Sequence, residues 1–336
     1  MKVIKVRNVN DAFYRGIELF TIKSNFRKQM SRNGATLESN EPVVTVYLHP
    51  WERVLFDKDR DANPFFHLIE SIWMIAGSQK LHPLTYFNSG MANFSDDAEN
   101  LNGAYGYRWV NKFGFDQIQV VLELLERDPE SRRAVLQMWD CVHDLDSPSK
   151  DIPCNTQIFF KVRSGKLQMT VCNRSNDMIW GAYGANAVHM SVLQEYMASA
   201  LDVGMGAYYQ VSDSFHVYEN KGWSSIKHKA GLFPMYKYPD VYPLVAHPKS
   251  FPFECEDFIE QISGTLDEAT LTFPKYQNPF FNEVLEPMVK TFVAHKERNY
   301  VNADKYLSEI KADDWKVTCT NWINKRRTAY EKKHGH

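Results

Sequence analysis

The amino-acid sequence predicts an α+β fold, in which helices and strands are mixed along the chain. Two observations support this prediction: helical and strand-like segments follow one another without regular β–α–β alternation, and no glycine-rich phosphate-binding loop links a strand to a helix. The chain has 336 residues, of which 44% are hydrophobic and 24% charged. This composition is typical of a folded protein with a large buried core.

The first part of the chain is predicted to form two helices separated by a strand. Residues 10–30 place apolar side chains at helical spacing after an Asn/Asp start, which predicts an amphipathic helix that "SRNGAT" (residues 31–36) breaks. The alternating segment "EPVVTVYLHP" (residues 41–50) predicts a strand. The segment "ANPFFHLIESIWMIAG" (residues 62–77) predicts a strongly apolar helix that ends at Gly77.

The middle of the chain predicts a helix, a strand and then a hairpin. Residues 116–133 have the pattern of a helix closed by a proline-containing turn, and residues 134–140 have that of a strand. The strand-like segments "TQIFFKV" (residues 156–162) and "KLQMTVCN" (residues 166–173) flank the short polar turn "RSG". This arrangement predicts a β-hairpin.

Beyond the hairpin, residues 186–204 have the strongest helical pattern of the sequence, and residues 207–220 predict a further strand. The composition changes near residue 227, where a segment rich in proline and tyrosine begins. We expect two or three helices after this segment, the last one carrying "DDWKVTCTNWINKRRTAYEKKHGH".

Charge and cysteine usage exclude several classes of protein. A net charge of −2 and a pI near 6.6 argue against a nonspecific nucleic-acid-binding protein, which needs excess Lys and Arg. No apolar run is long enough for a membrane span or a signal peptide. The five cysteines form no C-x-x-C pair, and no Cys/His spacing fits a zinc site. We therefore expect a cytoplasmic protein that binds no membrane, no nucleic acid and no metal.

Two side chains have both a structural and a chemical interpretation. Cys154 stands between a proline and an asparagine at the start of a predicted strand, and it is either a buried structural thiol or a nucleophile. Glu70 lies inside an apolar helix, and it is either neutralised by a partner or kept there for proton transfer. The second interpretation follows because apolar surroundings raise the pKa of a carboxylate.

Four arginines stand at local breaks in the predicted elements. Each alone is well explained as a solvated surface charge. Together with the hydroxyl of Ser175, they are also the groups that bind a phosphate monoester, because guanidinium groups form bidentate hydrogen bonds with phosphate oxygens. The four are Arg32, Arg132, Arg133 and Arg174.

Seven motifs resemble the thymidylate synthase family in order and in approximate spacing. They are "SRNG", "HLIESIWMIAG", "GAYGYRW", "DPESRR", "PCNT", "CNRSNDMIWGAYGANAV" and "SDSFHVY". The likeness covers residues 13–220, about two thirds of the chain. It implies the family's twisted mixed β-sheet with packed helices, and a homodimer formed by packing of one sheet on the other. We accordingly divide the chain into a thymidylate synthase-like catalytic domain (residues 1–240) and a helical C-terminal extension packed on the same unit (residues 241–336).

The resemblance implies covalent catalysis on a pyrimidine nucleoside 5′-monophosphate. The thiolate of Cys154 attacks C6 of the base, and C5 then takes a one-carbon unit from the co-substrate 5,10-methylenetetrahydrofolate. Arg174 is expected to lower the pKa of the thiol, since nearby positive charge favours the thiolate. By the same resemblance, Arg32, Arg174 and Ser175 hold the phosphate. The family's counterparts of Arg132 and Arg133 reach across from the other subunit.

Three further matches concern recognition of the nucleoside. Asn186 matches the asparagine that reads the edge of the pyrimidine, and it favours uracil, because a related branch that acts on deoxycytidylate has aspartate there. His216 and Tyr218 match the pair that binds the 3′-hydroxyl of the sugar. Outside this set of motifs, both side chains are better explained as a hydrogen-bonded core pair; within it, the binding role is favoured. His189 or His216 could also serve as the base of a cysteine hydrolase, but nothing in their sequence surroundings favours that role.

The remaining matches concern the folate and proton transfer. Asp177 matches the carboxylate that contacts the pterin, Glu70 the glutamate that organises water and proton transfer, and Tyr105 the tyrosine near the catalytic base. Asn155 stands where synthases usually have histidine, so one member of the hydrogen-bond network is changed. Met91 stands at a folate-binding position where synthases commonly have tryptophan.

Further departures favour a different product. Phe94 replaces a second tryptophan, one extra residue lies between Asp177 and Asn186, and another lies between Asp213 and His216. The short apolar C-terminus that closes over the folate in the family is not found. A looser lid admits water to the exocyclic methylene intermediate.

We therefore expect hydroxymethylation of dUMP, with tetrahydrofolate released unoxidised. Three alternatives remain open: a thymidylate synthase that makes dTMP, a CMP or dCMP hydroxymethylase, and an inactive homologue that only binds nucleotides.

Overall fold

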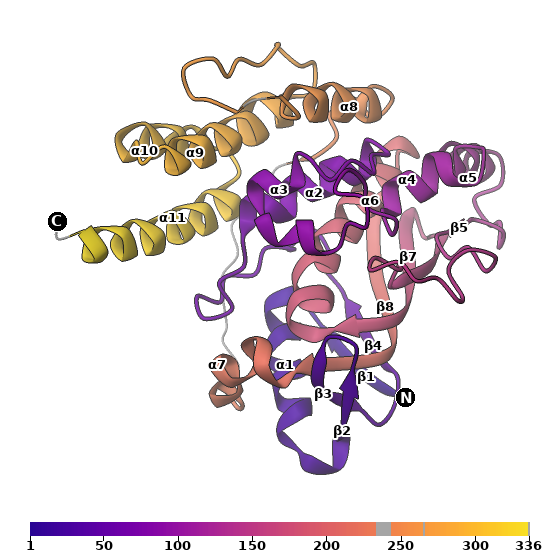
Figure 1. Cartoon of the computed structure of the whole chain (residues 1–336). Coiled ribbons are helices and arrows are strands. Elements are labelled where there is room, and N and C mark those ends of the chain that lie inside the picture. The colour runs from indigo at the N-terminus through magenta and orange to yellow at the C-terminus, as the bar shows by residue number, and fades with distance from the viewer. Residues whose placement is uncertain (233–242, 265, 335–336) are drawn as a thin grey trace.

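The computed structural model describes residues 1–232, 243–264 and 266–334 (Figure 1). Its strands are β1 (Lys2–Val6), β2 (Phe26–Ser31), β3 (Gly34–Ser39), β4 (Val43–Tyr47), β5 (Val135–Gln137), β6 (Asn155–Arg163), β7 (Lys166–Asp177) and β8 (Gly204–Tyr218). Within the described residues they form one sheet in the order β1-β4-β8-β7-β6-β5, to which the β2–β3 hairpin is joined through β8. The sheet is mixed, because the β1–β4 and β7–β8 pairs are parallel and the others antiparallel.

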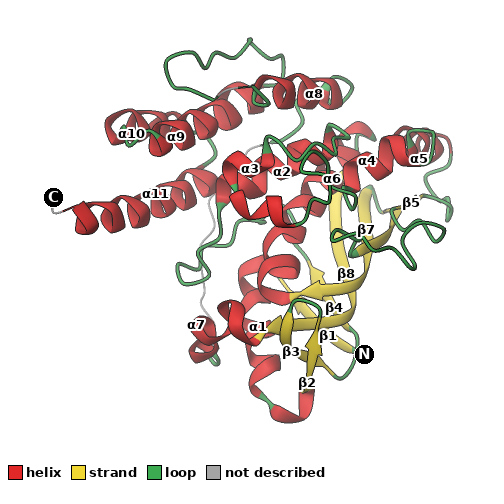
Figure 2. Ribbon diagram, in the orientation of Figure 1, coloured by secondary structure: helices red, strands yellow, loops and turns green. Residues whose placement is uncertain are grey.

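Helices cover this sheet, and the predicted α+β class is confirmed (Figure 2). The longer helices are α1 (Val9–Thr21), α2 (Pro64–Ile75), α5 (Gln117–Arg127), α6 (Asn186–Ala200), α8 (Phe251–Gln261), α9 (Glu286–Lys296), α10 (Tyr300–Glu309) and α11 (Asp313–His334). The short ones are α3 (Leu84–Phe87), α4 (Tyr105–Tyr107) and α7 (Ser224–Ile226). Among the described residues, no helix is both long enough and apolar enough to cross a membrane.

The predicted apolar helix over residues 62–77 is confirmed as α2, and its ends have local causes. The side chain of Asn63 accepts a hydrogen bond from the backbone N–H of Phe66, and Pro64 occupies the first helical position. Gly77, just after the helix, has a φ of +63°. Glycine adopts this left-handed conformation without a Cβ clash, so the chain can leave the helix there.

The predicted helix over residues 10–30 is wrong in its second half. Helix α1 ends at Thr21, and residues 26–31 form β2 instead. Strand β2 pairs with β3 in antiparallel register from Phe26 opposite Ser39 to Ser31 opposite Gly34, so Arg32 and Asn33 form a two-residue turn. The Asn-Gly pair is a hairpin signal, and the backbone hydrogen bonds to β3 outweigh the helical spacing of the apolar side chains.

The other predicted elements are confirmed with small shifts of their ends. Residues 41–50 contain β4, residues 116–133 contain α5, residues 134–140 contain β5, and residues 186–204 contain α6. The strand predicted over residues 207–220 is β8, which ends at Tyr218. The predicted hairpin is β6–β7, and its turn residues Ser164 and Gly165 have φ values of 51° and 69°. Positive φ at both positions matches the twist of a tight hairpin.

The register of β6, β7 and β8 brings distant motifs to one end of the sheet. Asn155 lies opposite Asn173 on the neighbouring strand. In the parallel β7–β8 pair, Asp177 lies opposite His216. Helix α6 packs against β7, β8 and α2, so the first turn of α6 faces the same end of the sheet. This convergence places residues from four separate motifs within one small region.

Among the described residues, four helices, α8 to α11, follow the proline- and tyrosine-rich segment, where the sequence predicted two or three. In Figure 1, α8, α9 and α10 lie above α2 and α3, and α11 lies to their left, on the side away from the sheet. Trp322 of α11 packs edge-on against Phe65 of α2 with ring centroids 5.4 Å apart. The division at residues 240 and 241 falls outside the described residues, and the two-domain description stays a prediction.

Candidate active site

Cys154 lies directly before β6, where it is partly buried. Arg174 of β7 holds the backbone around it. The guanidinium group donates hydrogen bonds to the carbonyl oxygens of Pro153 (2.9 Å) and Ile152 (3.0 Å), and the backbone N–H of Arg174 donates to the carbonyl of Cys154 (2.9 Å). The hairpin therefore joins the predicted nucleophile to a predicted phosphate-binding residue, as the motif order implied.

The pKa of the Cys154 thiol is raised in the isolated chain. Burial is the largest cause, and the carboxyl group of Asp151 adds to it, whereas Arg174 and Arg32 act in the opposite direction. The sequence-based expectation that Arg174 lowers the pKa is correct in direction but wrong in outcome, because burial outweighs the nearby positive charge. A thiolate near neutral pH therefore needs further positive charge or less burial.

A row of buried amides leads from Asn155 into the core. The side-chain amide of Asn155 donates to Oδ1 of Asn186 (3.4 Å), and Nδ2 of Asn186 donates to Oδ1 of Asn176 (3.1 Å). Nδ2 of Asn176 donates in turn to Oε1 of Gln210 (3.1 Å) and to Oγ of Ser212 (3.0 Å). The sequence analysis missed Asn176 and Gln210, because nothing local marks two amides that are 34 residues apart as partners.

Glu70 and Tyr105 line a cavity of about 160 Å³ together with Met91 and Asn186. The hydroxyl of Tyr105 accepts a hydrogen bond from the backbone N–H of Asn155 (3.4 Å), which links the cavity to the residue after Cys154. Burial raises the pKa of Tyr105, so its hydroxyl stays protonated. His189 of α6 also lines this cavity, and its Nε2 lies 2.9 Å from Oε2 of Glu70.

A second cavity, of about 690 Å³, is lined by Arg32, Asp177 and Tyr218 among others. Oδ1 of Asp177 accepts a hydrogen bond from the backbone N–H of Trp180 (2.6 Å), whereas Oδ2 is buried without a hydrogen-bond partner among the described residues. Burial raises the pKa of Asp177, and the charges of His216 and Arg60 oppose this shift. An unpaired buried carboxylate oxygen is costly, so it marks a place where a ligand N–H would be favourable.

Arg60, which the sequence analysis did not single out, lies against Trp180, one of the residues that line the second cavity. Its guanidinium group lies 4.2 Å from the ring centroid of Trp180, and its Nε donates to the carbonyl of Ile179 (2.7 Å). Burial lowers the pKa of Arg60 to about 10, so it stays charged at neutral pH. The only sequence signal was a lone arginine in the loop before α2, which is ordinary for a surface charge.

A family model described as thymidylate synthase matches residues 63–277, more than half of the chain. This match includes the hairpin, α6 and the cavity residues Glu70, Tyr105 and Asn186.

The chain belongs to the thymidylate synthase family.

Several members of the thymidylate synthase family are similar to this chain. A deoxyuridylate hydroxymethyltransferase of Pseudomonas phage M6 is 42% identical over 98% of this chain and 96% of its own length. A deoxyuridylate hydroxymethyltransferase of Bacillus phage SP01 is 39% identical over 56% of this chain and 52% of its own length. A putative thymidylate synthase of Methanosarcina acetivorans is 28% identical over 67% of this chain and 93% of its own length.

The other predicted site residues differ in how closely they approach these cavities. Tyr218 receives a hydrogen bond from Nδ2 of Asn33 (3.5 Å) and packs edge-on against buried His216, with ring centroids 5.3 Å apart. Ser175 is half-buried on β7, opposite Ser214 of β8. These positions lie at the end of the sheet where the family's nucleotide would be expected.

Two of the predicted phosphate-binding arginines lie away from the cavities of this single chain. Arg132 and Arg133 are exposed in the turn between α5 and β5, and no described residue forms a hydrogen bond or ion pair with either guanidinium group. Arg32 is also exposed, but it donates to the carbonyl oxygens of Ser149 (3.3 Å) and Lys150 (2.9 Å) beside the site.

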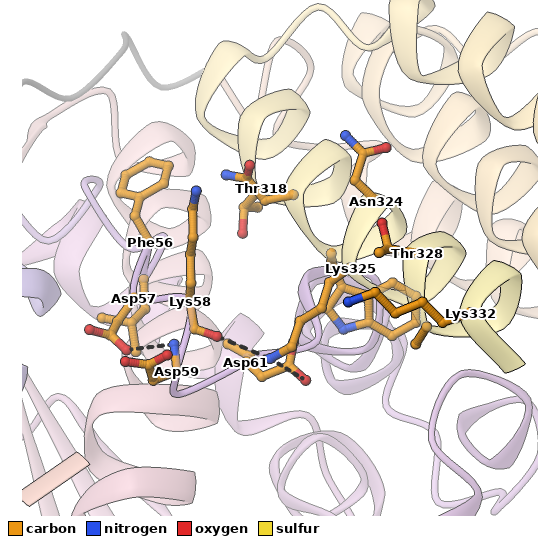
Figure 3. A pocket seen from close by; sticks show the side chains of 15 residues that line it. Phe56, Asp57, Lys58, Asp59, Asp61, Thr318, Asn324, Lys325, Thr328 and Lys332 are labelled. Atoms are coloured by element: carbon orange, nitrogen blue, oxygen red, sulfur yellow. Dashed lines mark hydrogen bonds and ion pairs between the residues drawn. The ribbon is translucent and has the colours of Figure 1, made fainter. Parts of the chain in front are cut away.

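A separate cavity of about 570 Å³ lies between residues 55–62 and α11 (Figure 3). It contains none of the predicted site residues. Its aspartates are paired with cations: Asp57 and Asp59 lie 2.6 and 2.8 Å from Nζ of Lys229, and Asp61 lies 3.0 Å from Arg326. No described group of three or more His, Cys, Asp or Glu side chains is arranged to hold a metal ion.

Proposed function

We propose that this chain transfers a one-carbon unit from 5,10-methylenetetrahydrofolate to C5 of dUMP and releases 5-hydroxymethyl-dUMP and tetrahydrofolate. The observation that carries the proposal is the similarity, over nearly the full length of both chains, to a protein named a deoxyuridylate hydroxymethyltransferase. The arrangement of Cys154, Arg174 and Asn186 at one end of the sheet supports it.

Cys154 is the proposed nucleophile that adds to C6 of the base. Its sulfur is nucleophilic as the thiolate and leaves again readily at the end of the reaction. The backbone contacts of Arg174 fix the loop before Cys154, and its cation favours the thiolate. The phosphate of the nucleotide is proposed to bind to Arg32, Arg174 and Ser175, with the sugar hydroxyl beside His216 and Tyr218.

The row of buried amides supports a uracil base. Nε2 of Gln210 donates to the backbone carbonyl of Ala182 (3.4 Å), which turns Oε1 of Gln210 toward Asn176. Asn176 then presents its oxygen to Asn186, so Nδ2 of Asn186 is fixed on that side. Uracil offers a carbonyl oxygen as acceptor and a ring N–H as donor. In this orientation, the second hydrogen on Nδ2 of Asn186 can be donated to the carbonyl, and Oδ1 of Asn186 can accept from the ring N–H. Cytosine would require the opposite orientation.

The folate is proposed to bind in the cavity of about 690 Å³. Oδ2 of Asp177 is free to accept a hydrogen bond from a pterin N–H, and Trp180 and Phe94 line the same space. Flat aromatic side chains favour a flat ring. When bound, the folate supplies the one-carbon unit. Met91, which lines the cavity beside Glu70, is proposed to contact the folate from that side.

A homodimer is proposed to complete the site. Half-buried side chains on the face of the sheet opposite α6 lie in register across three strands: Phe159 is opposite Thr170, and Thr170 is opposite Tyr209. A second sheet packed on this row would bury it. Arg132 and Arg133 would then be free to reach the partner's phosphate site, which would add the positive charge that the isolated chain lacks around Cys154.

The test is product identification with purified protein. dUMP, dCMP and CMP are each incubated with 5,10-methylenetetrahydrofolate, and nucleotides and folates are identified by mass spectrometry. We expect 5-hydroxymethyl-dUMP and tetrahydrofolate from dUMP. A methyl product together with dihydrofolate would instead identify a thymidylate synthase. Release of tritium from C5-labelled dUMP separates both enzymes from an inactive nucleotide-binding protein, which exchanges nothing.

A further inference from the structure

The proposed reaction needs a group that removes a proton from water, and the cavity beside Glu70 contains a candidate that the family's motifs do not mark. His189 lies in the first turn of α6, three residues after Asn186, so both side chains project from the same face of the helix. Helix α2 packs against α6 and presents Glu70 to this face. The two helices therefore bring a carboxylate and an imidazole together at the wall of the cavity.

The contact between these two side chains is close and isolated. Nε2 of His189 and Oε2 of Glu70 are 2.9 Å apart, both atoms are shielded from solvent, and neither has another hydrogen-bond partner among the described residues. His189 is only 4% exposed. Burying two polar groups that have no other hydrogen-bond partners costs free energy of folding. The presence of this pair at the wall of a cavity therefore indicates a function.

The carboxylate determines which ring nitrogen of His189 carries the proton. A carboxylate at hydrogen-bonding distance from Nε2 favours the tautomer with hydrogen on Nε2, which leaves the lone pair on Nδ1. No described residue forms a hydrogen bond with Nδ1. His189 lines the cavity of about 160 Å³, which is large enough for a water molecule. Nδ1 is therefore the nitrogen available to that water.

Other groups at the cavity are less suited to accept a proton. Burial raises the pKa of Tyr105, so its hydroxyl remains protonated. Oδ2 of Asp151 accepts a hydrogen bond from the backbone N–H of Gly103 (2.6 Å). Burial lowers the pKa of His67, so His67 stays neutral and adds no charge beside the pair. Glu70 is in contact with Nε2 of His189 and acts through it.

We propose that His189 is the catalytic base that removes a proton from the water molecule that adds to the exocyclic carbon, with Glu70 as its positioning residue. This proposal rests on the proposed hydroxymethyl transfer. It explains why water would add to the intermediate in this protein. The base lines the cavity beside Glu70, and it lies in the same turn of α6 as Asn186, the side chain proposed to bind the pyrimidine.

The step balances without an oxidant or a reductant. The water oxygen forms a bond to the exocyclic methylene carbon, and the electron pair of that double bond moves into the ring as an enolate through C4. The enolate re-forms the C5–C6 double bond and breaks the C6–S bond, which returns Cys154 as a thiolate. The proton of the water goes to Nδ1 of His189. The overall reaction of dUMP, methylenetetrahydrofolate and water to 5-hydroxymethyl-dUMP and tetrahydrofolate is redox-neutral.

The experiment compares an early and a late step in the same variant. With His189→Ala, we expect the first turnover to release tritium from C5-labelled dUMP in a burst of about one equivalent per active site, because this step precedes hydration, while formation of 5-hydroxymethyl-dUMP falls by roughly 10²- to 10⁴-fold, the usual effect of losing a general base. Added imidazole should restore part of the product formation. His189→Gln should be as slow and should not respond to imidazole, because its side chain fills the space without supplying a base.

The matched control is His295→Ala, which removes another buried histidine, on α9, that lines neither cavity of the predicted site. Circular dichroism and thermal unfolding confirm that the variants are folded. The proposal is overturned if His189→Ala makes product as fast as His295→Ala, or if the first-turnover burst of tritium release falls as much as product formation does, without response to imidazole. Failure of the wild-type chain to make a hydroxymethyl product would overturn the proposed function itself, and this is seen before any variant is made.

Discussion

The cavity beside Glu70 measures about 160 Å³, whereas the cavity beside α11 measures about 570 Å³. The larger one is lined by aspartates that are already paired with Lys229 and Arg326. The smaller one contains polar atoms of Glu70 and His189 that have no further partner among the described residues. The buried indole Nε1 of Trp322, which lines the larger cavity, also has no hydrogen-bond partner among the described residues. A buried carboxylate and imidazole that contact only each other therefore indicate the reaction site more clearly than volume or an unpaired atom alone, because these two groups can transfer protons.

The largest effect is expected from Cys154→Ser. A serine hydroxyl is a far weaker nucleophile than a thiolate, so product formation and tritium release should both fall by about 10³-fold or more. Steady-state assays with dUMP measure this loss. Normal turnover by this variant would remove the basis for assigning chemistry to this end of the sheet rather than to the α11 cavity.

The next effect concerns base choice and tests the buried amides. Gln210→Met removes one of the two acceptors of Asn176 and leaves the Ser212 hydroxyl, which can donate as well as accept. Asn176 and Asn186 can then turn their amides, and discrimination between dUMP and dCMP should fall by roughly 10- to 100-fold. The readout is the ratio of kcat/KM for the two nucleotides. Gln210→Glu is the matched control, because it keeps an oxygen acceptor facing Asn176 and should keep the preference for dUMP. Equal discrimination by both variants would argue against this role of the amide row.

A third effect lies in the helical C-terminal region and concerns stability. Burial raises the pKa of Asp314, at the start of α11, to about 7. The folded state therefore holds this proton more tightly than the unfolded state does, so stability is present at low pH and is lost as pH rises through 7. The free energy of unfolding should fall by about 1.4 kcal/mol between pH 6 and 8 from this group alone.

Asp314→Asn should remove this part of the pH dependence. Urea unfolding at pH 6, 7 and 8 gives the measurement, with wild-type protein as the reference. A slope unchanged by the substitution would show that another group titrates. Turnover per folded molecule should stay the same, since Asp314 lines neither cavity of the predicted site.

The smallest effect is expected from Asp61→Asn in the cavity beside α11. Asp61 forms ion pairs with Arg326 (3.0 Å) and Lys325 (3.3 Å), and all three side chains are partly exposed. Loss of such pairs should lower the free energy of unfolding by about 1 kcal/mol or less and leave kcat/KM within about twofold. The pairs lower the pKa of Asp61, so their contribution is present at neutral pH and is lost in acid. A large loss of activity would show that this cavity takes part in the reaction.

Much of the site could be predicted from the sequence, because local patterns determine local structure. The "RSG" turn predicted the hairpin, and the hairpin brings Arg174 to Cys154. The helical period of residues 186–204 predicted that Asn186 lies at the start of a helix. The seven ordered motifs identified the family that the full-length comparison supports.

The tertiary structure alone decided four features. Residues 26–31 became a strand because β3 supplies backbone partners that helical spacing does not reveal. The contact between Glu70 and His189 joins residues 119 positions apart, and the amide row depends on β7, β8 and α6 meeting. Burial raised the pKa of Cys154 despite Arg174. Each of these depends on contacts between segments that are distant in the sequence, or on burial away from water. Both arise only when the whole chain has folded, so local sequence patterns do not reveal them.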